Sequence, residues 1–309
     1  MILNKTNSWV LFGVLVVLLT STALCTFVAL FSYDAELKDE QTETGNNAFI
    51  DGNINMEHPS EEPAKPNKIS FQPVIDDWIK SIGGEKSVMV YDLDRDEIGG
   101  IYDEQEGYAT ASLYKLFVIY EGYKLIESGK WKADDDAGVT SYNIEECLDL
   151  SIRESNSICA ETLWHMMGED YLDDVVADEY GLGNTTVSDF TSTAEDVTMM
   201  MKKYYSLFKT DDVLAIRMKD SFLNQPATEY DWRQGLPSGF SGNVKVYNKV
   251  GWDYNEDAGY WNLYHDTAVV EFTDYDRHFV VTVLTSGVPY QSIRKFGTLF
   301  EEYFYSNVQ

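Results

Sequence analysis

The sequence predicts an α/β fold of the α+β sandwich type, with one antiparallel five-stranded sheet built from both ends of the chain. Three observations predict it. Two strand-like segments come early, a long block of helical periodicity follows, and three more strand-like segments with a closing helix come last. An antiparallel sheet that is flanked by helices, with an all-helical lobe inserted between its halves, satisfies this order.

The folded domain is expected to span residues 69–309, and it opens with a helix and a hairpin. Residues 73–82 predict a short helix with Pro73 in its first turn, where the missing N–H costs little. Residues 87–91 and 98–102 are rich in strand-forming residues and lie on either side of a turn. They therefore predict two paired strands.

The turn of this hairpin places Asp92, Asp94 and Asp96 at alternate positions. That spacing resembles a calcium-binding loop. Glu97 stands at the position where such a loop needs glycine. We therefore expect a solvated turn and no metal site.

The middle of the chain shows the spacing of apolar residues that is typical of amphipathic helices. A threonine and an aspartate three residues later, Thr193 and Asp196, resemble a capping box at the start of one helix. The expected helices span residues 110–127, 143–153, 157–167, 170–180, 193–208 and 211–224.

The last part of the chain completes the sheet. The expected strands span residues 244–250, 267–272 and 279–285, and a closing helix spans residues 292–305. Side chains alternate between the two faces of a strand. Lys245, Tyr247, Lys249 and Gly251 are therefore expected to share one face.

The segment before the folded domain predicts a membrane anchor. Residues 9–31 are apolar and uncharged over a length that can cross a bilayer as a helix. Lys5 precedes them and acidic residues follow, which places the N-terminus inside. The exit sequence Ala29-Leu30-Phe31 suits signal cleavage poorly, so we expect an uncleaved anchor.

This interpretation divides the N-terminal part into three: residues 1–8 at the cytoplasmic side, a signal anchor over residues 9–31 and a stalk over residues 32–68. The stalk is rich in acidic residues and proline and poor in large apolar residues, so we expect it to be disordered. The protein is then a single-pass protein of the cell membrane, with its folded domain outside the cytoplasm.

Composition excludes one class of partner. The formal net charge is −29 at pH 7. Binding to nucleic acid needs clustered Lys and Arg against the phosphates, so no nucleic-acid partner is expected. The acidic balance identifies no partner by itself.

Three cysteines are present, and Cys25 lies in the expected anchor. An extracytoplasmic domain could join Cys147 and Cys159 by a disulfide. Both are expected to lie in helices, and we therefore expect two small buried thiols.

Three short elements occur in a fixed order: Ser112-Leu113-Tyr114-Lys115, Ser155-Asn156-Ser157 and Lys249-Val250-Gly251. On a helix Ser112 and Lys115 share a face, and a lysine whose pKa is lowered by burial can take the proton of a serine nucleophile. Two other Ser-x-x-Lys pairs, Ser206/Lys209 and Ser292/Lys295, lack partners at workable spacings. The ordered set therefore predicts acyl transfer with Ser112 as nucleophile, Lys115 as base and Ser155 as proton shuttle.

The remaining site residues complete this chemistry. Lys249 offers positive charge to a substrate carboxylate, and Gly251 permits close approach of the substrate backbone. The backbone N–H groups of Ser112 and Trp252 are the expected oxyanion hole. The plain alternative is that Ser112 and Lys115 lie on a helix surface, Ser155 caps a helix and Lys249 is a solvated strand residue.

Other chemistries find little support. A Gly-x-Ser-x-Gly elbow, a His-Glu-x-x-His motif and paired Cys-x-x-Cys motifs do not occur, and of four histidines His58 lies in the stalk. No glycine-rich loop for phosphates occurs either. We therefore expect no metal and no cofactor.

With these motifs the chain resembles the penicillin-recognising serine hydrolases, and among them the class A β-lactamase-like domain, over about residues 87–305. The similarity includes residues 156–163 after the second motif, residues 233–237 before the motif strand, and His265-Asp266 at the start of the next strand. The resemblance implies an α/β sandwich with a helical lobe. It implies Ser112 as the acylated residue, Lys115 as base, Ser155 as relay and Lys249 as carboxylate anchor.

Three departures from the family pattern bear on activity. Ser157 replaces an asparagine that grips the substrate amide, and Val250 replaces a threonine whose hydroxyl helps to hold a carboxylate. Residues 181–192 replace a longer loop with a glutamate that activates the deacylating water. Asp189 is the sole acid in this segment, and we expect it to cap a turn.

We therefore expect a membrane-anchored serine hydrolase of the β-lactamase/penicillin-binding type. By resemblance, its substrates are peptides with a free C-terminal carboxylate, such as peptidoglycan stem peptides, or β-lactams that imitate them. Two alternatives remain open. One is a competent β-lactamase that uses Asp189 for deacylation, and the other is a non-catalytic sensor or wall-binding module.

Overall fold

The structure, a computed structural model, describes residues 65–138, 141–227, 230–255 and 260–308. The expected cytoplasmic end, the anchor and most of the stalk lie outside these residues. Within them, no helix combines the length and the apolar character that crossing a membrane requires.

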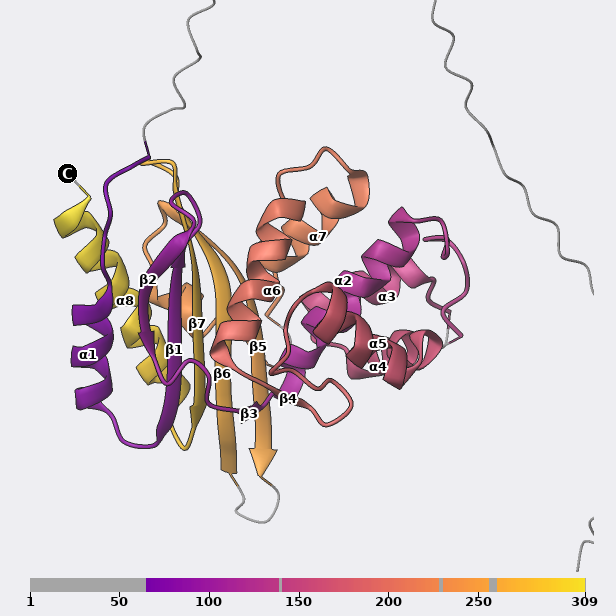
Figure 1. Ribbon diagram of the computed structural model, residues 1–309, viewed down its shortest axis with the longest axis horizontal. Coiled ribbons are helices and arrows are strands. Elements are labelled where there is room, and N and C mark those ends of the chain that lie inside the picture. The colour runs from indigo at the N-terminus through magenta and orange to yellow at the C-terminus, as the bar shows by residue number, and fades with distance from the viewer. Residues whose placement is uncertain (1–64, 139–140, 228–229, 256–259, 309) are drawn as a thin grey trace, which may run out of the picture. The chain divides into compact units, whose positions relative to one another are not determined.

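A five-stranded sheet forms the centre of the domain (Figure 1). Every pair of neighbouring strands is antiparallel. Across the sheet the order is β2 (Glu97–Tyr102), β1 (Glu85–Asp92), β7 (Arg277–Ser286), β6 (Tyr260–Phe272) and β5 (Val244–Asn255). The two strands from the early part of the chain therefore pair with the three late strands through β1 and β7, as the sequence predicts, and β5 lies at one edge.

Helices cover both faces of this sheet. On one face lie α1 (Gln72–Ser81) and α8 (Tyr290–Asn307), and the remaining helices lie on the other side, where most of them form a lobe (Figure 1). They are α2 (Tyr114–Glu127), α3 (Ile144–Arg153), α4 (Ser157–Met167), α5 (Glu169–Asp174), α6 (Ala194–Leu207) and α7 (Val213–Leu223). The α5 helix continues as one π-helical segment, η2 (Val175–Glu179).

Each face of the sheet has its own hydrophobic core. Between the sheet and α1 and α8, aromatic rings pack among aliphatic side chains, and the rings of Phe71 and Phe300 stack with their centroids 3.9 Å apart. The second core joins the other face of the sheet to α6 and the helical lobe. Val246 belongs to the first core and Tyr247 to the second, as the expected alternation along β5 requires.

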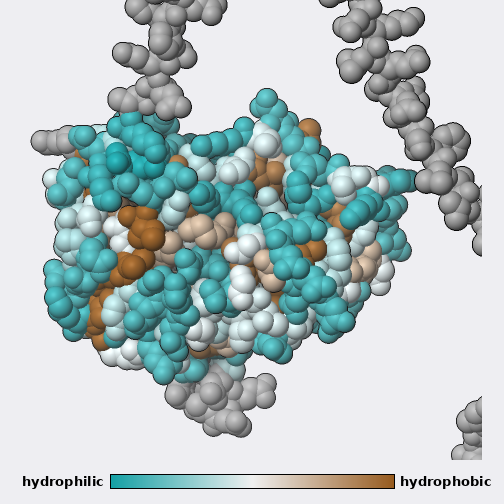
Figure 2. All heavy atoms as spheres, viewed as in Figure 1, coloured by the Kyte–Doolittle hydropathy of each residue, from teal (hydrophilic) through white to brown (hydrophobic). Residues whose placement is uncertain are grey.

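Outside these cores the surface is polar. Hydrophilic residues cover most of the face shown in Figure 2, with smaller hydrophobic patches between them. A high negative net charge of this kind favours solubility but does not specify the fold.

Four short elements were absent from the sequence prediction. A two-stranded sheet pairs β3 (Tyr108–Ala109) with β4 (Thr191–Ser192), and 3-10 turns form η1 (Ala111–Leu113) and η3 (Leu236–Gly239). The expected helix over residues 110–127 is therefore η1 followed by α2, and Ser112 lies in the 3-10 turn and not in the α-helix.

The acidic hairpin turn is satisfied by protein side chains. Asp92 accepts a hydrogen bond from Arg277 at 2.5 Å, Asp94 contacts the His278 ring at 3.0 Å, and Asp96 pairs with Lys202. Each carboxylate thus has a basic partner, and the turn ties the hairpin to β7 and α6.

The expectation of two free thiols is wrong. Cys147 on α3 and Cys159 on α4 form a disulfide, and both residues are buried. Helical periodicity showed that each cysteine faces the core, but it could not show that α3 and α4 pack side by side at that point.

Candidate active site

Ser112 lies in a tight turn that the surrounding chain holds in place. The preceding residue, Ala111, has a φ of 44°, a left-handed conformation that costs an alanine about 1 kcal/mol or more. On one side of the turn, the N–H of Thr110 donates to the carbonyl of Phe190 at 2.7 Å. On the other, His265 Nε2 contacts the carbonyl of Ala109 at 2.8 Å.

The protonation of His265 follows from its two partners. Its Nδ1 accepts a hydrogen bond from the N–H of Thr285 at 2.9 Å, so the proton resides on Nε2 and is donated to Ala109. Burial lowers the pKa of His265 to about 4, which keeps the ring neutral near pH 7. This histidine therefore acts as a fixed support for the turn that carries Ser112.

Gly251 lets the turn that carries Ser112 lie against the edge strand β5. A Cβ at this position would lie 2.5 Å from the carbonyl oxygen of Thr110 and 2.8 Å from Leu113 Cγ. No side chain fits there without moving the turn. The glycine thus has a structural reason in addition to the close substrate approach expected from the sequence.

Lys115 directs its ammonium group at all the hydroxyls of the site. Its Nζ lies 3.1 Å from Ser112 Oγ, 3.0 Å from Ser157 Oγ and 3.4 Å from Ser155 Oγ, and it donates to the carbonyl of Ser155 at 2.5 Å. The side chain is fully buried. Burial lowers the pKa of Lys115 to about 8, an effect that Glu161 opposes. About a tenth of this lysine is therefore neutral at pH 7.

Ser155 and Ser157 come from the short connection between α3 and α4. Ser155 has a φ of 55°, which directs both its carbonyl and its hydroxyl toward the lysines. Asn156 caps α4, since its side chain accepts the N–H of Cys159 at 3.0 Å. Ser155 therefore does not cap this helix, and its hydroxyl is free for the site.

Lys249 reaches the same hydroxyl from the opposite side. Its Nζ donates to Ser155 Oγ at 2.8 Å and to the carbonyl of Val250 at 2.9 Å. Burial and the nearby Lys115 charge lower the pKa of Lys249 well below its usual range, and Asp266 opposes this. Within the described residues neither lysine forms an ion pair, so two buried bases meet at Ser155.

The structure thus brings together Ser112, Lys115, Ser155, Ser157, Lys249 and Gly251. The rival Ser-x-x-Lys pairs are not assembled in this way. Ser206 Oγ donates to the carbonyl of Lys202 at 3.3 Å, and the Lys209 ammonium lies over the ring of Tyr205. Within the described residues no hydrogen bond joins Ser292 to Lys295, although both lie on α8.

Two further site predictions remain untested. Trp252 lies half-buried on β5, which is the edge strand of the sheet. The oxyanion role of the Ser112 and Trp252 N–H groups stays a prediction. Asp189 is exposed in a turn closed by the hydrogen bond from the N–H of Phe190 to the carbonyl of Val187, and no hydrogen bond of its carboxylate appears among the described residues.

Sequence reasoning missed the polar network beneath the motif strand. Asp266 is buried and accepts hydrogen bonds from Asn248 and from the N–H of Leu236, while Arg233 donates to Asn248. Burial raises the pKa of Asp266 to about 7, against the effect of those hydrogen bonds. A Cβ at Gly235 would lie 2.2 Å from Asp266 Oδ2, which explains the glycine at that position.

Glu161 was also missed. It lies exposed on α4, one turn beyond Ser157, and its charge raises the pKa of Lys115 and that of Tyr114. The next turn of the same face carries Trp164, which packs against Tyr114. The i, i+4 spacing from Ser157 was visible in the sequence. The sequence did not show that this face of α4 packs against Tyr114 at the start of α2.

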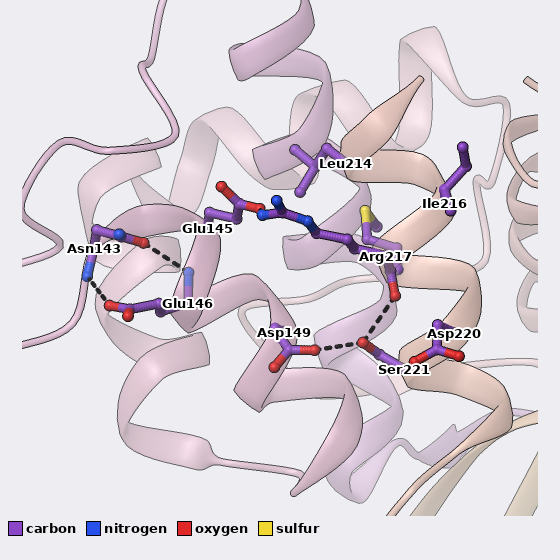
Figure 3. A pocket seen from close by; sticks show the side chains of 10 residues that line it. Asn143, Glu145, Glu146, Asp149, Leu214, Ile216, Arg217, Asp220 and Ser221 are labelled. Carbon is purple, nitrogen blue, oxygen red and sulfur yellow. Dashed lines mark hydrogen bonds and ion pairs between the residues drawn. The ribbon is translucent and has the colours of Figure 1, made fainter. Parts of the chain in front are cut away.

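A cavity of about 580 Å³ lies elsewhere, between α3 and α7 (Figure 3). Neighbours satisfy its acids: Arg217 pairs with Glu145, Ser221 donates to Asp149, and Glu146 belongs to the capping box of α3 (Figure 3). None of the candidate site residues named above lines it. The described residues also contain no cluster of acids, histidines and cysteines that could hold a metal ion.

Comparison with known proteins agrees with this fold. The model of a family described as "Beta-lactamase enzyme family" matches residues 70–299. A search of curated proteins finds no match to the sequence.

Several solved structures share the fold. A class A β-lactamase from Bacteroides cellulosilyticus aligns at 14% identity with a TM-score of 0.65, covering 78% of this chain and 100% of its own. PBP-A aligns at 15% identity with a TM-score of 0.65, and the alignment covers 79% of this chain and 100% of PBP-A. The TLA-1 extended-spectrum β-lactamase aligns at 13% identity with a TM-score of 0.65, covering 76% and 98%. A PBP-A mutant with a TM-score of 0.63 and 15% identity, covering 76% and 95%, is an acyl-enzyme complex with penicillin G.

Proposed function

Because this chain belongs to the beta-lactamase enzyme family, we propose that it is a serine hydrolase acylated at Ser112. The observation that carries the proposal is the contact chain from Ser112 through Lys115 and Ser155 to Lys249, with Nζ–Oγ distances between 2.8 and 3.4 Å. A buried lysine with a lowered pKa beside a serine hydroxyl is the arrangement that activates a nucleophile without histidine.

The proposed reaction begins when Ser112 Oγ attacks the carbonyl carbon of a substrate amide while its proton passes to neutral Lys115. The C–N bond of the resulting tetrahedral adduct then breaks. Ser155 gives its hydroxyl proton to the leaving nitrogen and takes one from the Lys115 ammonium, which returns Lys115 to the neutral form. The products are an ester on Ser112 and a free amine, and the proton count balances.

Ser155 is suited to this relay by its position between two amines. Its oxygen can accept a hydrogen bond from Lys115 and another from Lys249, so its own O–H can be directed to a third partner. The backbone of Ser155 is in the left-handed region, a strained conformation of the kind that clusters at active sites.

The substrate class follows from the uncompensated amines. An anionic group on the substrate would favour the positively charged form of Lys249, whose pKa burial lowers. We propose a carboxylate, as in a cell-wall stem peptide or in a β-lactam that imitates one. Val250 lacks the threonine hydroxyl that would help to hold this carboxylate. The side chain of Ser157 is shorter than that of asparagine, so it reaches less far toward the substrate amide.

Intact-mass measurement of the full-length protein after exposure to a labelled penicillin tests the proposal. We expect a stoichiometric adduct that maps to Ser112, and its loss in a folded Ser112→Ala variant. Ser206→Ala and Ser292→Ala are matched controls and should label as the wild type does. Absence of any adduct on the folded wild type would instead support the non-catalytic sensor or wall-binding alternative.

We also propose that the chain is anchored in the cell membrane by residues 9–31, with the N-terminus inside and the hydrolase domain outside. Support comes from the length of this apolar stretch and from the charges on either side of it. A buried disulfide in the domain agrees with an oxidising compartment.

A further inference from the structure

We propose that the Cys147–Cys159 disulfide is a positioning element of the acylation site, which holds the Ser155-Asn156-Ser157 connection against the two lysines. The inference rests on the proposed function. It assigns to the cysteines a role in the rate of acylation in addition to their role in stability.

The disulfide closes a ring around the connection. It joins Cys147 on α3 to Cys159 on α4 across 12 positions of sequence, and Ser155 and Ser157 both lie inside this ring. Cys159 follows Ser157 by two residues, in the first turn of α4. A displacement of α4 relative to α3 would therefore move Ser157 directly, and it would move Ser155 through the two peptide units on either side of Asn156.

The connection needs such support because its backbone is strained. Ser155 has a φ of 55°, a conformation that costs a non-glycine residue roughly 1–3 kcal/mol and persists only where the surroundings enforce it. The N–H of Asn156 donates to the carbonyl of Leu150 at 3.1 Å, and the N–H of Cys159 to Asn156 Oδ1 at 3.0 Å. These hydrogen bonds fix the conformation of the connection itself. The disulfide fixes the spacing of α3 and α4, the two helices that the connection joins.

The contacts at stake are short and directional. Lys115 Nζ lies 2.5 Å from the carbonyl of Ser155 and 3.0 Å from Ser157 Oγ, and Lys249 Nζ lies 2.8 Å from Ser155 Oγ. A misplacement of about 1 Å in a catalytic group can lower a rate by about 100-fold. Without the disulfide, a relaxed connection would lengthen these contacts while the two hydrophobic cores stay intact.

The disulfide is itself shielded from reagents. Cys147 and Cys159 are 0% and 1% exposed, so a reductant reaches the bond only when the lobe opens. Substitution is therefore a cleaner perturbation than reduction. Cys25, which lies outside the described residues, offers a matched control.

The test compares the full-length wild type, the Cys147→Ala/Cys159→Ala variant and the Cys25→Ala variant, each titrated with labelled penicillin at several pH values. We expect the double variant to stay folded at 15 °C by circular dichroism, with the rate constant of Ser112 acylation at saturating penicillin lowered about 10–100-fold. The apparent Kd should change less than the rate constant, and the pH profile of acylation should change shape, because the contacts of Ser155 with both lysines change. Cys25→Ala should match the wild type.

A folded double variant that acylates at the wild-type rate, with the wild-type pH profile, would overturn the proposal. If the double variant does not fold, the wild type is reduced by a phosphine at low temperature and its free thiols are confirmed by mass. A folded, fully reduced protein that keeps the wild-type rate then also overturns it. If the oxidised wild type itself forms no adduct, the proposed function has failed, and that outcome is distinct from failure of the disulfide role.

Discussion

Burial of Lys115 should set the pH dependence of acylation. An amine with its ordinary pKa of 10.5 is about 0.03% neutral at pH 7, whereas one with a pKa of about 8 is about 10% neutral. Burial thus raises the fraction of usable base roughly 300-fold at this pH. We expect the rate constant at saturating penicillin to rise about tenfold per pH unit below pH 8 and to level off above it.

Glu161 provides the perturbation that tests this reasoning. Its negative charge raises the pKa of Lys115, against the larger effect of burial. In Glu161→Gln the pKa of Lys115 should therefore fall, the midpoint of the pH profile should move to lower pH, and acylation at pH 6–7 should become faster. The exposed acid Asp170, on α5, offers a control, and Asp170→Asn should leave the midpoint unchanged.

The assay is rapid-quench labelling at saturating penicillin from pH 6 to pH 10. Saturation matters because removal of a negative charge also strengthens binding of an anionic drug, which changes the apparent Kd but not the rate constant at saturation. A rate constant that does not vary between pH 6 and pH 9 would refute the role of Lys115 as base. A midpoint that moves to higher pH in Glu161→Gln would refute the assigned electrostatics.

Two further predictions concern the fold and the membrane. Gly251→Ala should abolish acylation and lower the free energy of unfolding by about 1–3 kcal/mol in a denaturant titration, because its Cβ meets the Thr110 carbonyl; Gly183→Ala, which meets nothing within 4 Å, should do neither. Protease added to intact cells should release a fragment that begins within residues 32–68. Protection of the whole chain until the membrane is opened would contradict the proposed orientation.

The order of strands and helices could be predicted because it depends on local periodicity. The pairing of β3 with β4 could not, since each strand has two residues and they lie far apart in the sequence. Strands β5 and β6 also extend further than predicted, and their register continues from Gly251 to Asn255. In this part of β5 both faces carry polar or aromatic residues. The alternation of apolar and polar residues that predicts a strand is therefore missing.

The candidate site divides in the same way. Ser112, Lys115, Ser155 and Lys249 could be named from short motifs, because the spacing within each motif reflects one turn or one strand. Their burial could not be read from the sequence, and burial is what lowers the pKa of both lysines. The Cys147–Cys159 bond depends on how two helices pack, so local pattern favoured free thiols and was wrong.

The hydrogen-bonded support of the site was the least predictable part. His265 was recognised only as part of a resemblance, yet its ring links the N–H of Thr285 to the carbonyl of Ala109 across two chain segments. Asp266 and Asn248 form a comparable link beneath β5. Such groups lack a sequence motif because their partners are set by the sheet register and not by spacing along the chain.

The fate of the acyl-enzyme is where this chain should differ most from a working β-lactamase. Hydrolysis of the ester on Ser112 needs a water held against it and a base to take the proton, which is typically worth about 10²–10⁴-fold in rate. The segment over residues 181–192 contains one acid, Asp189, which is exposed and has no hydrogen-bond partner among the described residues. Among the described residues nothing holds this carboxylate in place, so it is poorly suited to fix a water against the ester.

We therefore predict a long-lived adduct and little net hydrolysis of the drug. The wild type is labelled with excess penicillin and the unbound drug is then removed. The wild type should keep its added mass for many minutes, and Asp189→Asn should keep it equally long. Glu161→Gln belongs in the same series, because Glu161 is the carboxylate whose charge reaches Lys115. Loss of the adduct within seconds, with persistence restored by either substitution, would identify that carboxylate as the deacylating base and would make the β-lactamase interpretation the correct one.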